Sequence, residues 1–208
     1  QHVLLDGKPV PFLVELGVQT PAGKVKAQRR DKFRQVNRFL ELVEDVLPAL
    51  PAGRLRIVDF GSGKSYLTFA LHHVLTIVHG RDVDLVGLDL KEDVVATCNA
   101  LASTLGSEGL RFEVGDIAGY RGTDAADLVV SLHACDTATD AALERAVRWN
   151  APVILAVPCC QHELLAQVRS APLAPLLDRG LLRGRFASDV TDAARAKLLE
   201  AVGYDVQL

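Results

Sequence analysis

Short apolar runs alternate with helix-length segments through most of this chain, and that alternation constrains the fold more than any other feature. Five runs rich in Val, Leu and Ile predict strands at Leu55–Phe60, Asp84–Asp89, Leu110–Val114, Ala126–Leu132 and Pro152–Val157. The segments between them predict helices over 64–78, 91–105 and 139–149. Strands that alternate with helices form βαβ units with right-handed crossovers. We therefore expect an α/β fold with a doubly wound, mostly parallel sheet.

The first 48 residues precede this pattern and predict an N-terminal appendage. Two β-prone runs flank the Thr20–Gly23 turn and predict a hairpin. A helix is expected from Asp31 to about Leu47, because its apolar residues recur on one face. The stretch Lys24–Arg38 holds seven basic residues and one acid, although the net charge of the chain is −3. This local charge favours contact with the phosphates of RNA, and the alternative is a solvated helix face.

Residues 49–208 are expected to form the core domain. Its last helix is predicted over roughly 190–202, and Tyr204–Leu208 predicts the start of a sixth strand. With five strands and the start of a sixth, the fifth strand would lie at an exposed sheet edge, which natural sheets avoid. We therefore expect that the strand or strands that would cover this edge are missing from the sequence. The chain has no Met and begins at Gln1, and we expect it to be a piece of a longer product.

The apolar stretches are too short for a membrane helix. The longest, Tyr66–Val78, contains 13 residues with two histidines among them, whereas a span needs about 20. The four cysteines, two of them adjacent, are unlike a secreted disulfide framework. We expect a soluble protein of the reducing cytoplasm that has no membrane partner.

A glycine-rich turn, Asp59–Ser65, joins the first strand to the next helix. A P-loop of the G-x-x-x-x-G-K-[ST] type would need its first glycine at Val58, so the nucleoside triphosphate reading fails. A dinucleotide fingerprint would need its third glycine at Tyr66 and is weakened too. Enzymes that use S-adenosylmethionine carry an acid two residues before the first glycine, and Asp59 stands there.

Further acids end the second and third strands. Asp89 is expected to bind the ribose hydroxyls of this cofactor, and Asp116 with Ile117 is expected to lie by the adenine. The alternative is that the glycines only make a turn and the acids are solvated. The predicted cofactor-binding residues are Asp59, Gly61, Ser62, Gly63, Lys64, Asp89, Leu90, Asp116, Ile117, Ser131 and Leu132.

Polar residues also gather after the fourth and fifth strands, in Ser131–Asp140 and Val157–Glu163. Neighbouring parallel strands bring their carboxyl ends to one crevice, so the two clusters should meet. His133 is the first candidate for the catalytic base, with Asp140 and His162 in support. Zinc is the competing hypothesis because its usual ligands are Cys and His, but the spacing is not a standard C-x-x-C pair, and no metal is assigned. The zinc candidates are His133, Cys135, Cys159, Cys160 and His162.

Together these motifs resemble a known family. The turn continuing to Leu67, the H-x-C-x-x-x-T-D run His133–Asp140 and the C-C-x-H run Cys159–His162 are similar to class I S-adenosylmethionine-dependent methyltransferases. The most similar group is a "methyltransferase domain" family related to the enzyme that 2′-O-methylates a ribose in the tRNA acceptor stem. Ser65 stands where the usual turn has its third glycine.

The resemblance spans roughly residues 30–165. It implies a Rossmann-like class I methyltransferase fold, S-adenosyl-L-methionine as cofactor and RNA modification as function. Two alternatives stay open: a methyltransferase acting on protein or a small molecule, and a cofactor-binding module that has lost catalysis.

Overall fold

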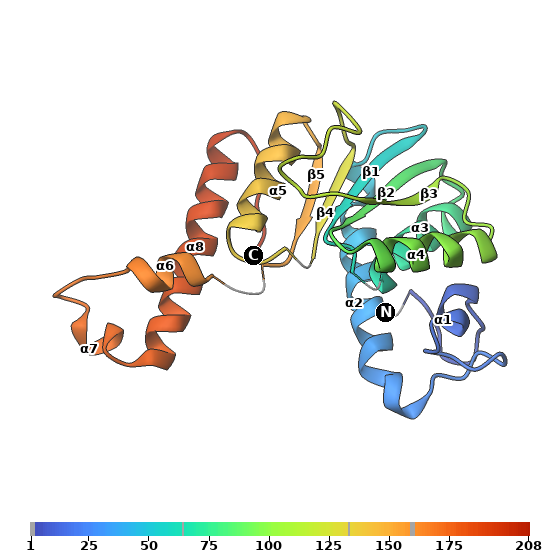
Figure 1. Cartoon of the computed structure of the whole chain (residues 1–208), viewed down its shortest axis with the longest axis horizontal. Coiled ribbons are helices and arrows are strands. Elements are labelled where there is room, and N and C mark those ends of the chain that lie inside the picture. The colour runs from blue at the N-terminus through green and yellow to red at the C-terminus, as the bar shows by residue number, and fades with distance from the viewer. Residues whose placement is uncertain (1–2, 64, 133, 159–160) are drawn as a thin grey trace.

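A computed structural model describes residues 3–63, 65–132, 134–158 and 161–208. Its centre is a five-stranded parallel sheet with the order β3-β2-β1-β4-β5 (Figure 1). The strands are β1 (Leu55–Phe60), β2 (Val83–Asp89), β3 (Leu110–Val114), β4 (Leu128–Ser131) and β5 (Val153–Ala156). The predicted α/β fold is confirmed. Because β2 and β4 flank β1, the strand order reverses at β1, and doubly wound sheets bind ligands beyond the carboxyl end of such a strand.

Helices connect and cover the strands. The main ones are α2 (Arg30–Val46), α3 (Tyr66–His73), α4 (Glu92–Thr104), α5 (Thr137–Arg148) and α8 (Gly180–Ala201). Shorter ones are α1 (Pro11–Glu15), α6 (His162–Gln167), α7 (Ala174–Leu177), the 3-10 turns Ala27–Arg29 and Leu47–Ala49, and the π-helical segment Val74–Val78 that extends α3. In Figure 1, α4 lies beside β3, and α5 and α8 lie toward the β5 side.

Alternation along β1 divides the core into two clusters. Leu55 and Ile57 belong to the cluster that includes the apolar residues of α2, α3 and α4. Val58 and Phe60 belong to the other, where Phe60 stacks on Trp149 with ring centroids 5.8 Å apart. Asp59 lies on the same face of β1 as Leu55 and Ile57, so its side chain faces α3.

The N-terminal segment corrects one expectation. Pro11–Glu15 forms α1 instead of the first hairpin strand, and what the described part of this segment keeps of the hairpin is an isolated antiparallel bridge between Gln19 and Val25. Proline has no N–H for a strand ladder but suits the first turn of a helix. The turn also buries Phe12 and Leu13. The predicted basic helix is confirmed as α2, and its apolar face packs in the same cluster as the sheet.

The C-terminal segment corrects two more. Helix α8 begins at Gly180, well before the expected start near Val190. Tyr204–Leu208, all within the described ranges, forms no strand. A strand needs backbone hydrogen bonds to a neighbouring strand. This segment is held by a side-chain contact, in which the Tyr204 hydroxyl donates a hydrogen bond to the Ala151 carbonyl at 2.8 Å. None of the described helices has the length and apolar character needed to cross a membrane.

Candidate functional site

The glycine-rich turn lies at the carboxyl end of β1, where the connections change direction. Gly61 and Gly63 have φ of 70° and 53°, a left-handed region that costs glycine little. The Ser62 amide donates to the Leu88 carbonyl at 2.9 Å and ties the turn to β2. Among the described residues that are not its chain neighbours, a Cβ on Gly63 would come within 4 Å only of the Gly61 oxygen, at 3.9 Å. The described residues therefore do not crowd the backbone at Gly63.

Asp89 ends β2 and contacts the turn directly. One carboxylate oxygen accepts a hydrogen bond from the Gly63 amide at 2.9 Å, and the other accepts one from the Lys91 amide at 3.0 Å. Each oxygen has a second lone-pair site, so the carboxylate can also accept two ligand hydroxyls. The structure thus brings the Asp89 side chain to the Gly63 backbone, and the ribose-binding role of Asp89 stays a prediction. Leu90, which follows, is 72% exposed.

Asp59 lies beneath the turn rather than at its surface. Its side chain is 3% exposed and accepts a hydrogen bond from the Thr68 hydroxyl of α3 at 2.6 Å. Burial raises the pKa of Asp59 to about 7, and the hydrogen bond from Thr68 only partly opposes that rise. This carboxyl therefore titrates near neutral pH. Its role toward a ligand stays a prediction.

Asp116 and Ile117 follow β3, next to Asp89. The Gly115 amide donates to the Asp89 carbonyl at 3.0 Å, and the Asp116 carboxylate accepts from the Gly119 amide. Asp116 also lines an open surface hollow of about 390 Å³. The residues that line this hollow lie between Glu113 and Gly122, and neither Asp89 nor the glycine-rich turn is among them, so the adenine role of Asp116 and Ile117 stays a prediction.

Ser131 and Leu132 end β4 on the other side of β1, and both are buried. Ser131 pairs in register with Phe60, one residue before the turn. Its hydroxyl is buried and finds no hydrogen-bond partner among the described residues. A buried hydroxyl without a partner is costly. The described residues around the turn therefore fit a polar ligand: they do not crowd the Gly63 backbone, Asp89 can accept hydroxyls and the Ser131 hydroxyl has no partner among them.

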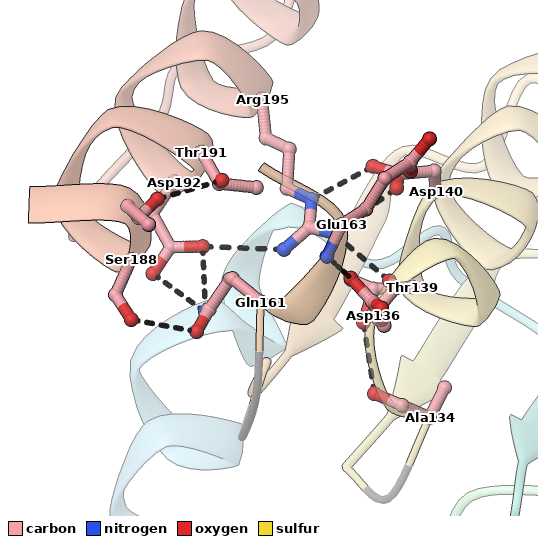
Figure 2. Close-up of polar contacts among 11 residues, drawn as sticks. Ala134, Asp136, Thr139, Asp140, Gln161, Glu163, Ser188, Thr191, Asp192 and Arg195 are labelled. Atoms are coloured by element: carbon pink, nitrogen blue, oxygen red, sulfur yellow. Dashed lines mark hydrogen bonds and ion pairs between the residues drawn. The ribbon is translucent and has the colours of Figure 1, made fainter. Parts of the chain in front are cut away.

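The loops after β4 and β5 do meet, as the sequence predicts. The Asp136 carboxylate accepts a hydrogen bond from the Glu163 amide at 3.1 Å, which joins the first loop to the start of α6 (Figure 2). His162, the first residue of α6, is exposed. His133 and Lys64, with Cys159 and Cys160, lie outside the described residues.

Asp140 has a partner that the sequence did not reveal. Its two carboxylate oxygens accept from Arg195 Nε at 2.7 Å and from Nη2 at 3.1 Å. Asp140 was expected to orient a histidine, and that role stays a prediction. Sequence reasoning also missed Gln161, Asp192 and Thr68. Arg195 is 55 residues from Asp140, so no local pattern could have paired them.

The zinc hypothesis is largely untested. No group of three metal-ligating side chains occurs among the described residues, and three of the five proposed ligands lie outside them. Cys135 is exposed on the loop after β4.

Two kinds of similar protein were found by comparison of sequences and structures. The human "Glutathione S-transferase C-terminal domain-containing protein" is 24% identical over 222 residues, which are 92% of this chain and 32% of the relative. Its mouse counterpart is 25% identical, with the same coverage. The chain therefore spans about a third of the length of these curated relatives.

Solved structures resemble the sheet and its helices. A putative sarcosine dimethylglycine methyltransferase from Galdieria sulphuraria is 13% identical, with a TM-score of 0.46 over 60% of this chain and 44% of that one. The Synechocystis magnesium protoporphyrin IX methyltransferase, solved with bound SAH, is 19% identical, with a TM-score of 0.45 over 61% and 57%.

The family itself is shown by a sequence model. The model described as "Methyltransferase domain" matches residues 31–167, about two thirds of the chain. The matched range runs from the start of α2 through both candidate catalytic loops. The match and the residues around the turn support S-adenosylmethionine as the cofactor. This chain belongs to the methyltransferase domain family.

Proposed function

We propose that this domain transfers the methyl group of S-adenosylmethionine to a nucleophile on RNA. The observation that carries the methyltransferase part is the hydrogen bond from the Gly63 amide to Asp89. This contact sets a carboxylate with free acceptor sites beside the glycine-rich turn, at the place where doubly wound sheets bind ligands, and it supports a ribose-binding role for Asp89. The family match agrees with it.

When bound, S-adenosylmethionine supplies an electrophilic methyl on a sulfonium. In our proposal Asp89 accepts the two ribose hydroxyls, and the Gly61–Gly63 backbone lies under the methionine portion. Asp116 and Ile117 flank the adenine. The Ser131 hydroxyl gains its missing partner from the ligand. These contacts fix the orientation of the cofactor, and orientation is the main contribution that a protein makes to an in-line displacement.

A nucleophile such as a ribose hydroxyl must lose its proton as it reacts. We propose His133 as the base, with Asp140 and His162 in support, because an imidazole accepts protons near neutral pH. Methylation of a ribose 2′-hydroxyl, the chemistry of the tRNA-modifying enzyme that the sequence motifs resemble, is the finer form of this proposal.

The basic segment supports RNA as the substrate class. Arg30 and Arg34 are exposed at the start of α2 and line a hollow of about 210 Å³. Lys32, between them, places its ammonium 5.1 Å from the ring centroid of Tyr66, the first residue of α3. Tyr66 directly follows the glycine-rich turn. Through Lys32 the basic segment therefore reaches the helix that follows the turn, and in our proposal its cations hold the phosphates of the substrate.

A transfer experiment tests both parts of the proposal. Purified protein is incubated with tritiated S-adenosylmethionine and a cell extract, and the products are then treated with RNase or protease. We expect label that RNase releases. Release by protease alone would overturn the RNA assignment, and label in small molecules would do the same. Cofactor binding without any transfer would favour an inactive module.

Salt dependence tests the basic surface separately. We expect Arg30→Ala with Arg34→Ala to lower the slope of log affinity against log salt for purified RNA by roughly one to two. Arg148→Ala is the matched control, because Arg148 is equally exposed but lies on α5. An unchanged slope in the double variant would remove the basic segment from the substrate site.

A further inference from the structure

One arginine of α8 connects that helix to the loop after β4. The Arg195 side chain is 8% exposed, and its guanidinium grips Asp140 with two nitrogens (Figure 2). The Nη2 group also donates to the Asp136 carbonyl at 2.9 Å, and Nη1 donates to the Asp192 carboxylate at 3.2 Å. The planar guanidinium carries several N–H donors and can make all these contacts at once, whereas a lysine ammonium cannot.

The same helix also holds the residue before α6. Both carboxylate oxygens of Asp192 accept from the Gln161 side-chain nitrogen at 3.2 Å. The Ser188 hydroxyl donates to the side-chain oxygen of Gln161 at 2.9 Å. Gln161 is buried and directly precedes His162. Through Asp192, the Arg195 guanidinium therefore reaches the loop after β5 as well.

Between the two loops stands a residue in an unfavourable conformation. Asp136 has φ 54° and ψ −128°, a region that residues with a Cβ rarely adopt. Its carbonyl is held by Arg195, and its carboxylate accepts the Glu163 amide. A strained residue persists where its surroundings over-determine it, and such residues concentrate at functional sites.

We propose that Arg195 is a positioning residue for methyl transfer, which holds the loops after β4 and β5 in the arrangement that the acceptor requires. The inference rests on the proposed function, because those loops carry the candidate catalytic residues. It goes further by assigning their alignment to α8, whose guanidinium contacts the first loop directly and the second through Asp192. The competing explanation is that Arg195 only attaches α8 to α5.

Hydrogen–deuterium exchange on the full chain with S-adenosylhomocysteine distinguishes these explanations. In Arg195→Met we expect exchange to rise roughly tenfold in both 134–140 and 161–167, with β1 and β2 still protected. Arg195→Lys should raise the exchange in the same two segments. It should leave α5 and α8 folded, because a positive charge remains near Asp140. Lys197→Met is the matched control, because Lys197 is 78% exposed on the same helix and pairs only with Glu200 among the ion pairs of the described residues. A rise confined to 141–148 of α5 and to α8, with 134–140 and 161–167 unchanged, would overturn the proposal.

Transfer kinetics supply the second readout. For folded Arg195→Lys we expect kcat to fall roughly tenfold or more, with KM for S-adenosylmethionine within about twofold of wild type. A merely structural role would leave kcat per folded molecule unchanged, and that result would overturn the proposal. If the wild-type chain transfers no methyl group at all, the proposed function fails. The exchange experiment then decides by itself whether Arg195 couples the two loops.

Discussion

The ribose assignment of Asp89 gives the most direct test of the cofactor site. Asp89→Asn preserves the size of the side chain but replaces one acceptor oxygen by an NH₂ group that can only donate. In the structure both oxygens face donors, the amides of Gly63 and Lys91. The amide side chain must therefore leave one of these backbone groups facing another donor, and it can accept from only one ribose hydroxyl.

The magnitude follows from the hydrogen bonds lost. A hydrogen bond to a charged group contributes about 1.5–3 kcal/mol. Loss of the charge and of one hydroxyl contact should cost about 3 kcal/mol of binding free energy, which is on the order of a hundredfold in Kd. Unfolding should become easier by only about 1 kcal/mol, because Asp89 is half-buried and water can replace part of its contacts.

Calorimetry with S-adenosylhomocysteine measures this change, and Asp93→Asn is the matched control from the exposed first turn of α4. An analogue that lacks both ribose hydroxyls completes a double-mutant cycle with Asp89→Asn. We expect wild type to bind the analogue more weakly than S-adenosylhomocysteine. Asp89→Asn should bind the two ligands with nearly equal affinity. Asp89→Asn binding within threefold of wild type would refute the ribose assignment, as would full additivity in the cycle.

Three further results are expected. As the pH rises from about 4 to 7, the free energy of unfolding of Asp59→Asn should increase relative to that of wild type by about 1.4 kcal/mol per pH unit, because the raised pKa of Asp59 makes its ionisation oppose folding. Urea unfolding at several pH values measures this difference, and a difference that does not change with pH would contradict it. Asp127→Asn should lower the free energy of unfolding at pH 7 by about 1–3 kcal/mol, because the hydrogen bonds and charge of Arg56 outweigh the effect of burial and lower the pKa of Asp127. The same urea series should show a smaller loss below about pH 4, where Asp127 becomes protonated, and a loss that persists there would contradict this explanation. Lys32→Met should weaken RNA binding about tenfold at most but leave S-adenosylhomocysteine affinity unchanged, because Lys32 meets Tyr66 outside the turn; an equal loss of both affinities would place Lys32 in the cofactor site.

Much of the sheet and of the cofactor half was predictable. Buried parallel strands are nearly continuous apolar runs, and each of the five stands out against polar flanks. The chemistry of this half follows from position, because the acids at the ends of β2 and β3 are brought to one edge by the fold. For that reason the sequence predicts that Asp89 and the Gly61–Gly63 turn serve one cofactor site.

The ends of the chain were less predictable because tertiary contacts override weak local signals there. The apolar residues of Pro11–Glu15 suit a strand or a helical turn equally, and burial of Phe12 and Leu13 decides the outcome. The first half of α8 contains Gly180 and Gly184, which are poor helix formers, so its start was placed too late.

The acceptor half of the candidate site depends on contacts distant in sequence. Arg195 lies in a helix that was partly expected, but nothing in its neighbourhood distinguishes it from a solvated arginine. Its partners Asp140 and Asp136 are 55 and 59 residues away. Only the tertiary structure, in which Arg195 of α8 meets Asp140 of α5, reveals that its side chain is buried. Sequence reasoning can therefore identify the polar loops, but not the group that holds them.

The two halves of the candidate site are thus supported by different parts of the fold, and this separates binding from chemistry. The turn and Asp89 are joined to each other through backbone amides at the edge formed by β1 and β2. The loops after β4 and β5 are joined through side chains, with Arg195 at the centre. A change in the first half should alter cofactor affinity, whereas a change in the second should alter turnover at nearly constant affinity. Coupled losses in both would mean that α8 supports the cofactor site as well, which no contact among the described residues requires.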